Sequence, residues 1–178
     1  MLRLFNKRAS TEPVADEMYR QIVARARQPG LYENFAVADT LDGRFEMLMA
    51  HVILLLRRLR ALGAAELAQD VFDVMFADMD QALRELGVGD LSVARRIRPM
   101  AEAFYGRAAA YEAALAGDAA PGAFEAAVSR NVFPDGPPAD ATDRLAAYLR
   151  ALEAVLSASS LDDLTAGRIP WPAAERER

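Results

Sequence analysis

The sequence predicts an all-α fold, a single-domain bundle of about six to seven helices. Apolar residues recur at helical spacing of three and four along most of the chain, and no alternating run is long enough to indicate a strand. A length of 178 residues, with 53% apolar and 26% charged residues, suits one domain with a packed core. We expect the bundle to surround a central apolar helix over about residues 40–62.

The chain divides into three expected parts: a flexible N-terminus (1–12), a helical core (13–133), and a C-terminal loop, helix and tail that pack on it (134–178). The first helix is predicted over residues 14–28, because Pro29-Gly30 provides a stop signal. The most apolar run, residues 45–56, is shorter than the roughly 20 residues that a transmembrane helix needs. We therefore expect a cytoplasmic protein, with a peripheral position at the inner membrane left open.

The central helix has clear signals at both ends. Asp39 is a plausible N-cap with Asp42 in the capping-box position three residues later, and Gly63 follows the predicted end at Leu62. Nine apolar residues fall within an arc of about 180°, and further apolar residues lie outside it. Little of this helix is expected to face water.

The third predicted helix, residues 65–86, is amphipathic. An apolar arc that includes Phe72 and Phe76 lies opposite a group of acidic residues. Gly87 and Gly89 end this helix and are expected to permit the tight turn into the next one.

The fourth helix is predicted to begin at Asp90 or Ser92 and to carry an apolar stripe as far as Leu115. Because Pro99 lacks a backbone N–H, we expect a kink there or a late start near Ile97. Shorter helices are predicted over residues 123–132 and 142–157, on either side of a proline-rich loop at 134–138. Ser160 and Asp163 mark a last short helical turn.

The composition excludes much common chemistry. Cysteine is absent, which excludes disulfides, thiolate nucleophiles and cysteine-ligated metals, and His51 is the sole histidine. No serine stands at a telling spacing from His51, which we expect to be partly buried and hydrogen-bonded to a carboxylate or a carbonyl. We predict no catalytic residue, no cofactor and no metal.

The acidic helix raises the alternative of a di-metal carboxylate site. Such sites use Glu-x-x-His pairs that face the bundle interior, and this chain contains no such pair. Asp78 and Glu85 lie at the edge of the apolar arc, where a carboxylate needs a cation. Arg107 and Arg44 are the predicted partners.

The net charge of −5 is unevenly spread, with +3 on residues 1–60 and −8 on residues 61–178. An acidic chain does not bind DNA non-specifically, but a local basic face still meets phosphates of RNA or of anionic lipid. Two arginine clusters are candidates for such contact with a ribosome or a membrane surface: Arg57, Arg58 and Arg60, and Arg95, Arg96 and Arg98.

Three blocks of sequence go beyond composition: residues 39–45, residues 72–80 continuing through 84–93, and residues 104–107 with Tyr111. Taken together, they resemble the ubiquinol–cytochrome c chaperone family, the assembly factors for cytochrome b of respiratory complex III. The likeness runs from about residue 19 to residue 131. With His51, the motif residues that we take as candidates for client or partner binding are Asp39, Thr40, Asp42, Gly43, Arg44, Phe72, Phe76, Asp78, Asp80, Arg84, Glu85, Gly87, Gly89, Asp90, Phe104, Tyr105, Gly106, Arg107 and Tyr111.

The resemblance implies an all-helical, non-enzymatic chaperone that binds newly made cytochrome b. Eukaryotic members work with a small partner subunit near the ribosomal exit, so such a partner is also implied. The long N-terminal extension of the mitochondrial proteins is missing, which makes this chain look like a bacterial member. Most motif residues have a structural explanation as well, as helix starts, turns and packing contacts.

Two other functions stay open at this point. One is a small-molecule-binding or enzymatic domain with a pocket near His51, Tyr105 and Arg107. The other is a regulator that binds RNA through the arginine clusters.

Overall fold

The computed structural model describes residues 2–85, 87–136 and 140–173. This part of the chain contains eight helices and no strand, which confirms the all-α prediction. The structure has two helices more than the predicted minimum of six, and both are short. One lies in the expected connection after residue 28, and the other is the last turn. The helices are α1 (Leu2–Ala26), α2 (Pro29–Glu33), α3 (Leu41–Ala61), α4 (Ala65–Glu85), α5 (Asp90–Ala114), α6 (Ala123–Val132), α7 (Ala141–Ala158) and α8 (Leu161–Thr165).

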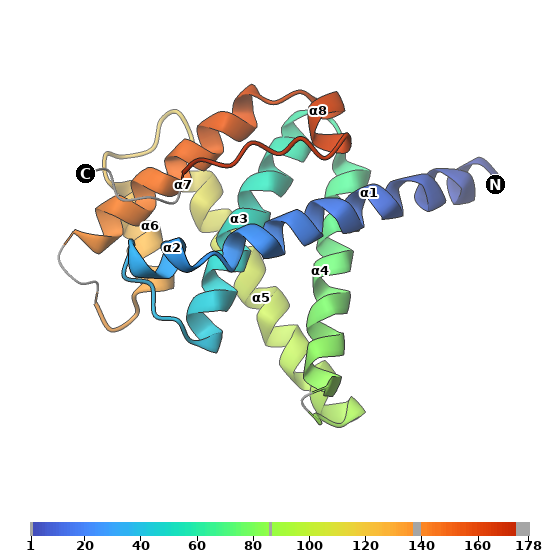
Figure 1. Ribbon diagram of the computed structural model, residues 1–178, viewed down its shortest axis with the longest axis horizontal. Coiled ribbons are helices and arrows are strands. Elements are labelled where there is room, and N and C mark those ends of the chain that lie inside the picture. The colour runs from blue at the N-terminus through green and yellow to red at the C-terminus, as the bar shows by residue number, and fades with distance from the viewer. Residues whose placement is uncertain (1, 86, 137–139, 174–178) are drawn as a thin grey trace.

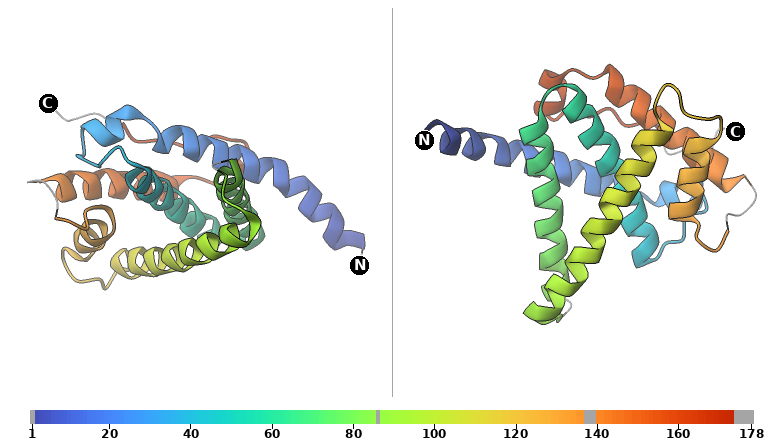
Figure 2. Two further views of the ribbon diagram at one scale, coloured as in Figure 1. Left: turned by 90° about the horizontal axis from the view of Figure 1, so that it is seen from below. Right: turned by 180° about the vertical axis from the view of Figure 1, so that it is seen from behind.

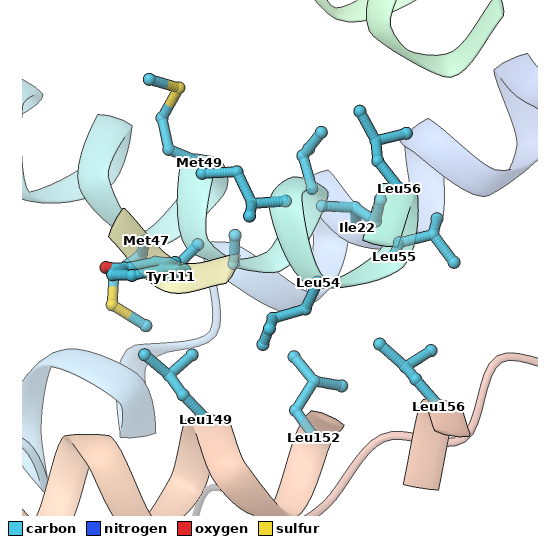
Figure 3. Close-up of a cluster of buried hydrophobic side chains, with 14 of the residues drawn as sticks. Ile22, Met47, Met49, Leu54, Leu55, Leu56, Tyr111, Leu149, Leu152 and Leu156 are labelled. Carbon is cyan, nitrogen blue, oxygen red and sulfur yellow. The ribbon is translucent and has the colours of Figure 1, made fainter. Parts of the chain in front are cut away.

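Helix α3 is the centre of the bundle, as predicted. All residues from Met49 to Leu56 are buried, so the middle of this helix has no face in contact with water. Figure 3 shows Leu149, Leu152 and Leu156 of α7 pointing toward α3 on one side. Burying a leucine side chain stabilises a fold by about 1.5–3 kcal/mol. This helix therefore supplies a large share of the core.

The other helices cover α3 from several directions. Helix α1 packs on both α3 and α4, α7 packs on α3, and α6 contacts α5 and α7 (Figure 1). The segment after α8 runs back along α7 toward the side of the bundle where α2 lies (Figure 1). The C-terminal helix and loop thus belong to the same packed unit as the rest of the described chain.

Helices α4 and α5 form an antiparallel hairpin whose turn projects from the body of the bundle (Figure 2). Gly87 has φ +79°, a left-handed conformation that disfavours any side chain, so the turn requires glycine there. Gly89 is the N-cap of α5 with φ −67°, and a Cβ added to it would meet no atom within 4 Å. The turn therefore requires the conformational freedom of glycine at residue 87 but not at residue 89.

Two predicted helix starts also differ from the structure. Helix α1 begins at Leu2, so the segment predicted to be flexible lies within a helix, whose first turns extend beyond the other helices (Figure 2). Helix α5 begins at Asp90 and continues through Pro99, so the late start near Ile97 is wrong. Pro99 leaves the carbonyl of Arg95 without an intrahelical donor, and both residues lie on the exposed side of the helix.

Some predictions fall outside the described residues. They concern residue Leu86 as the end of the third helix, part of the proline-rich loop at 137–139, and the tail at 174–178. The described helix α4 ends at Glu85.

Candidate functional site

The first motif block forms the start of α3. Thr40 is the N-cap, and its hydroxyl accepts a hydrogen bond from the Gly43 N–H at 3.1 Å. Asp39 instead accepts two bonds from the Arg44 guanidinium, at 2.6 and 3.2 Å, and this contact lowers the pKa of its carboxyl. The prediction of Asp39 as N-cap is wrong by one residue, since both side chains suit a cap and only the backbone conformation decides. Asp42 lies in the first turn of α3.

Gly43 has a steric role that composition does not reveal. A Cβ at this position would lie 2.0 Å from the carbonyl oxygen of Ala38, closer than any real contact. The segment before α3 therefore folds back tightly on the helix start. In contrast, a Cβ at Gly106 would meet no atom within 4 Å, so the other motif glycine within a helix is not needed for packing.

Arg107 forms an ion pair with Glu46, between α5 and α3. Its Nε donates to Glu46 Oε2 at 2.7 Å, and its Nη2 contacts the other carboxylate oxygen, a bidentate arrangement. Both side chains are largely covered, at 20% and 11% exposure. The carboxylate raises the pKa of Arg107. This pair holds the middle of the hairpin against the central helix.

The predicted arginine partners of Asp78 and Glu85 are wrong. Asp78 accepts a hydrogen bond from the hydroxyl of Tyr19 on α1 at 2.7 Å, and Glu85 accepts one from Gln81 on its own helix. Burial and the bond to Asp78 raise the pKa of Tyr19. Helix α1 packs along this edge of α4, which explains why the partner comes from α1 rather than from α5 or α3.

His51 is fully buried at 0% exposure, deeper than predicted, and is hydrogen-bonded on both ring nitrogens. Nδ1 lies 2.7 Å from the carbonyl oxygen of Met47, as a carbonyl partner was expected, and Nε2 lies 2.8 Å from the hydroxyl of Tyr148. The same hydroxyl accepts from Arg25 Nε at 3.0 Å. The ring of Trp171 packs 6.1 Å from the imidazole, centroid to centroid.

These contacts do not support a shared pocket at His51, Tyr105 and Arg107. His51 is sealed in the core, Tyr105 is 56% exposed on α5, and Arg107 is bound to Glu46. An open cavity of about 540 Å³ lies elsewhere, at the end of α7 and the segment after α8, where its lining includes Ser159 and Arg168. The structure therefore does not bring His51, Tyr105 and Arg107 together around one small-molecule pocket.

An aromatic patch covers one side of the hairpin where α4 faces α5. We define it as Phe72 and Phe76 of α4 with Tyr105 of α5, above the buried ring of Phe104. The ring of Phe72 lies 4.6 Å from Phe76 and 5.6 Å from Tyr105, centroid to centroid. Phe104 is 5.1 Å from Phe72 in an edge-on arrangement. Tyr105 is one of two large apolar side chains that are exposed in the described chain; the other is Leu41.

Helix α4, which carries two rings of this patch, is acidic. Six carboxylates and one arginine give the helix a charge of −5. Asp80 pairs with Arg84 one turn away, and Asp73 accepts from Gln69. No group of three or more metal-ligating side chains capable of holding an ion occurs in the described residues. The acidic side chains of α4 add negative charge to the surface of the hairpin.

The two arginine clusters have different surroundings. Arg57 lies 2.6 Å from Glu153 and 3.1 Å from Glu112, the second without hydrogen-bond alignment, and Arg58 donates to the carbonyl of Ser159. Two members of the first cluster are thus engaged within the fold. Arg95, Arg96 and Arg98 are all exposed on α5.

The remaining candidates are structural where they are described. Tyr111 is buried, and burial raises its pKa to about 12. Asp90 begins α5, and its side chain lies outside the described part. Sequence reasoning missed Tyr19, Glu46 and Tyr148 because each is polar within an otherwise apolar helical stripe. A polar residue within an apolar stripe is a signal that the side chain needs a partner, but it does not identify that partner.

The comparison with family models gives a match to the ubiquinol-cytochrome C chaperone over residues 33–171. The chain belongs to this family. The match covers more than half of the chain, and it extends the resemblance of residues 19–131 through the C-terminal helices. The assignment therefore rests on the whole bundle from α3 onward.

A solved structure supports the same assignment. The crystal structure of the Cbp3 homolog from Brucella abortus is 39% identical, with a TM-score of 0.80 over 97% of each chain. A comparison with curated proteins gives no match. In the described part of this chaperone-family member, no helix combines the length and the apolar character needed to cross a membrane.

Proposed function

We propose that this chain is a non-enzymatic chaperone that binds newly made cytochrome b during assembly of the ubiquinol–cytochrome c reductase complex. Membership of the ubiquinol–cytochrome c chaperone family is the observation that carries this proposal. The buried, neutral environment of His51 fits a binding protein better than an enzyme, because the histidine has no access to a substrate.

The aromatic patch is the surface we propose for the client. Monomeric proteins rarely expose clustered aromatic rings without a binding role, and aromatic side chains dominate protein interfaces. Phe72 and Phe76 are only half-buried, and Tyr105 is exposed on top of them. An unassembled membrane protein offers apolar segments that such a surface covers.

Charge supports the same surface. The loops of membrane proteins on the cytoplasmic side are rich in lysine and arginine. Helix α4, which carries Phe72 and Phe76 of the aromatic patch, has a net charge of −5 and is complementary to such loops. The patch thus suits an apolar segment flanked by basic residues.

The test is capture of cytochrome b by the full chain from detergent-solubilised membranes. We expect the wild type to retain cytochrome b, and Tyr105→Glu to retain about tenfold less because it breaks a hot-spot contact. Leu41→Glu is the matched control, since Leu41 is also exposed and apolar but lies away from the hairpin at the start of α3. Equal capture by both variants would refute the patch, and no capture by the wild type would refute the client. Capture of a small subunit without cytochrome b would assign the chain to that partner instead.

A further inference from the structure

The projecting end of the hairpin carries a second surface with different chemistry. We define the hairpin tip as residues 83–98 within the described chain, the end of α4 and the first half of α5. Figures 1 and 2 show that it lies away from the body of the bundle. None of its residues is aromatic.

The tip is locally basic in an acidic protein. Residues 83–98 contain four arginines and two carboxylates, a net charge of +2, whereas α4 alone carries −5. The whole chain has a net charge of −5, so an anionic surface attracts it only through locally basic segments such as this one. The positive charge of the tip therefore favours an approach with the tip toward such a surface.

Three arginines of the tip, on the first half of α5, are available for binding. In the described chain, no hydrogen bond or ion pair engages Arg95 or Arg96, and both are exposed. Arg98 pairs only with Glu102 one turn away, with 84% of the arginine side chain exposed. Such exposed pairs contribute little and exchange readily for another anion.

Apolar side chains lie among these arginines. Leu83 and Val88 are half-buried and do not belong to the core or to the shell packed against it. Ile97, between Arg96 and Arg98, is half-buried and packs against the core. Basic residues next to partly exposed apolar ones, here Leu83 and Val88, are typical of surfaces that lie in the headgroup region of a bilayer. RNA-binding surfaces favour aromatic residues for stacking, which the tip lacks.

We propose that the hairpin tip docks on the surface of an anionic lipid bilayer, with Arg95 and Arg96 on lipid phosphates and Val88 among the headgroups. Tyr105 lies ten residues along α5 from Arg95, about 15 Å at 1.5 Å per residue. Docking would thus hold the aromatic patch close to loops of a protein in the same membrane. The tip is a different surface from the aromatic patch, so a result that refutes bilayer docking does not refute client binding, and the reverse also holds.

The test is co-sedimentation of the full chain with vesicles at low salt. We expect binding to vesicles of phosphatidylcholine with one quarter phosphatidylglycerol, and none to phosphatidylcholine alone. Arg95→Glu/Arg96→Glu should lower the partition coefficient more than about tenfold, because each basic residue contributes about 1 kcal/mol near such a surface. Val88→Asp should also weaken binding.

The control is Arg27→Glu/Arg130→Glu, which changes the net charge equally at exposed positions just after α1 and on α6. Equal loss in both double variants, or no binding by the wild type, would overturn the proposal. Binding to polyuridylate but not to vesicles, lost in the tip variant, would make the tip an RNA surface instead. If vesicle binding fails while cytochrome b capture persists, docking alone is refuted.

Discussion

The hydroxyl of Tyr148 lies 2.8 Å from Nε2 of His51, and burial lowers the pKa of this histidine, so the ring is neutral and its contacts have one arrangement of protons. Arg25 Nε donates to the hydroxyl oxygen, the hydroxyl donates to Nε2, and Nδ1–H donates to the carbonyl of Met47. A protonated imidazole would leave the hydroxyl proton without its acceptor. The network therefore joins α1, α3 and α7 through a neutral histidine.

This network predicts a specific loss of stability in acid. Burial lowers the pKa of His51 from 6.5 to about 4, so the unfolded state binds a proton that the folded state refuses. The stability is complete above pH 6.5 and is lost as the pH falls toward 4. Between pH 7 and pH 5 we expect a loss of about 2 kcal/mol in the free energy of unfolding, measured by urea denaturation.

The control for this prediction is His51→Gln, which is less stable at pH 7 but lacks the titrating group. Contacts with arginine and serine lower the pKa values of carboxylates such as Glu125 and Asp163. These groups contribute equally to the pH dependence of stability in both proteins, so their effect cancels in the comparison. We expect a flatter pH profile in the variant. The same slope in both proteins would mean that His51 is not buried as described.

Gly43 and Gly106 provide a matched pair of helix glycines. Gly43→Ala places a methyl group against the Ala38 carbonyl, so we expect a loss of about 2–3 kcal/mol. Gly106→Ala meets open space and should gain up to about 1 kcal/mol from helix propensity. Urea denaturation followed by circular dichroism measures both, and a tolerated Gly43→Ala would contradict the close approach.

The cap of α3 distinguishes two adjacent residues. Thr40→Ala removes the acceptor for the Gly43 N–H and should cost about 1 kcal/mol. Asp39→Ala removes only an exposed pair with Arg44 and should cost less. Thermal unfolding of the two variants decides between them; the reverse order would restore Asp39 as the cap.

The Glu46–Arg107 pair should show energetic coupling. Glu46→Gln and Arg107→Met each leave a largely covered charge without its partner, and we expect each to lose about 2 kcal/mol. The double variant should lose less than the sum, with a coupling of about 1–2 kcal/mol in a double-mutant cycle. Additive losses would indicate that the pair contributes nothing beyond its separate side chains.

The helices that could be predicted from the sequence are those whose apolar residues recur with a strong helical period. The apolar residues of α3, α4 and α7 have a spacing that fixes the helix type, and glycine or proline marks several ends. The sequence did not predict the start of α1, because residues 2–13 carry no continuous apolar stripe and contain Pro13. It also placed no helix at Pro29–Glu33, since five residues are too few for a period to show.

The contacts within the candidate site were less predictable for a physical reason. Tyr148 meets His51 from 97 residues away, and Tyr19 meets Asp78 from 59 residues away. Spacing along one helix shows that a polar group needs a partner, but the packing of two helices decides which partner. The steric need at Gly43 is also invisible in sequence, because it depends on the path of the preceding loop.

The measurement that tests the central claim most directly is the complex III content of membranes from a strain that lacks this gene. We predict that cytochrome b and the assembled ubiquinol–cytochrome c reductase decrease while the other respiratory complexes persist, and that the wild-type chain restores them. Normal levels of complex III in the deletion strain would contradict the chaperone role.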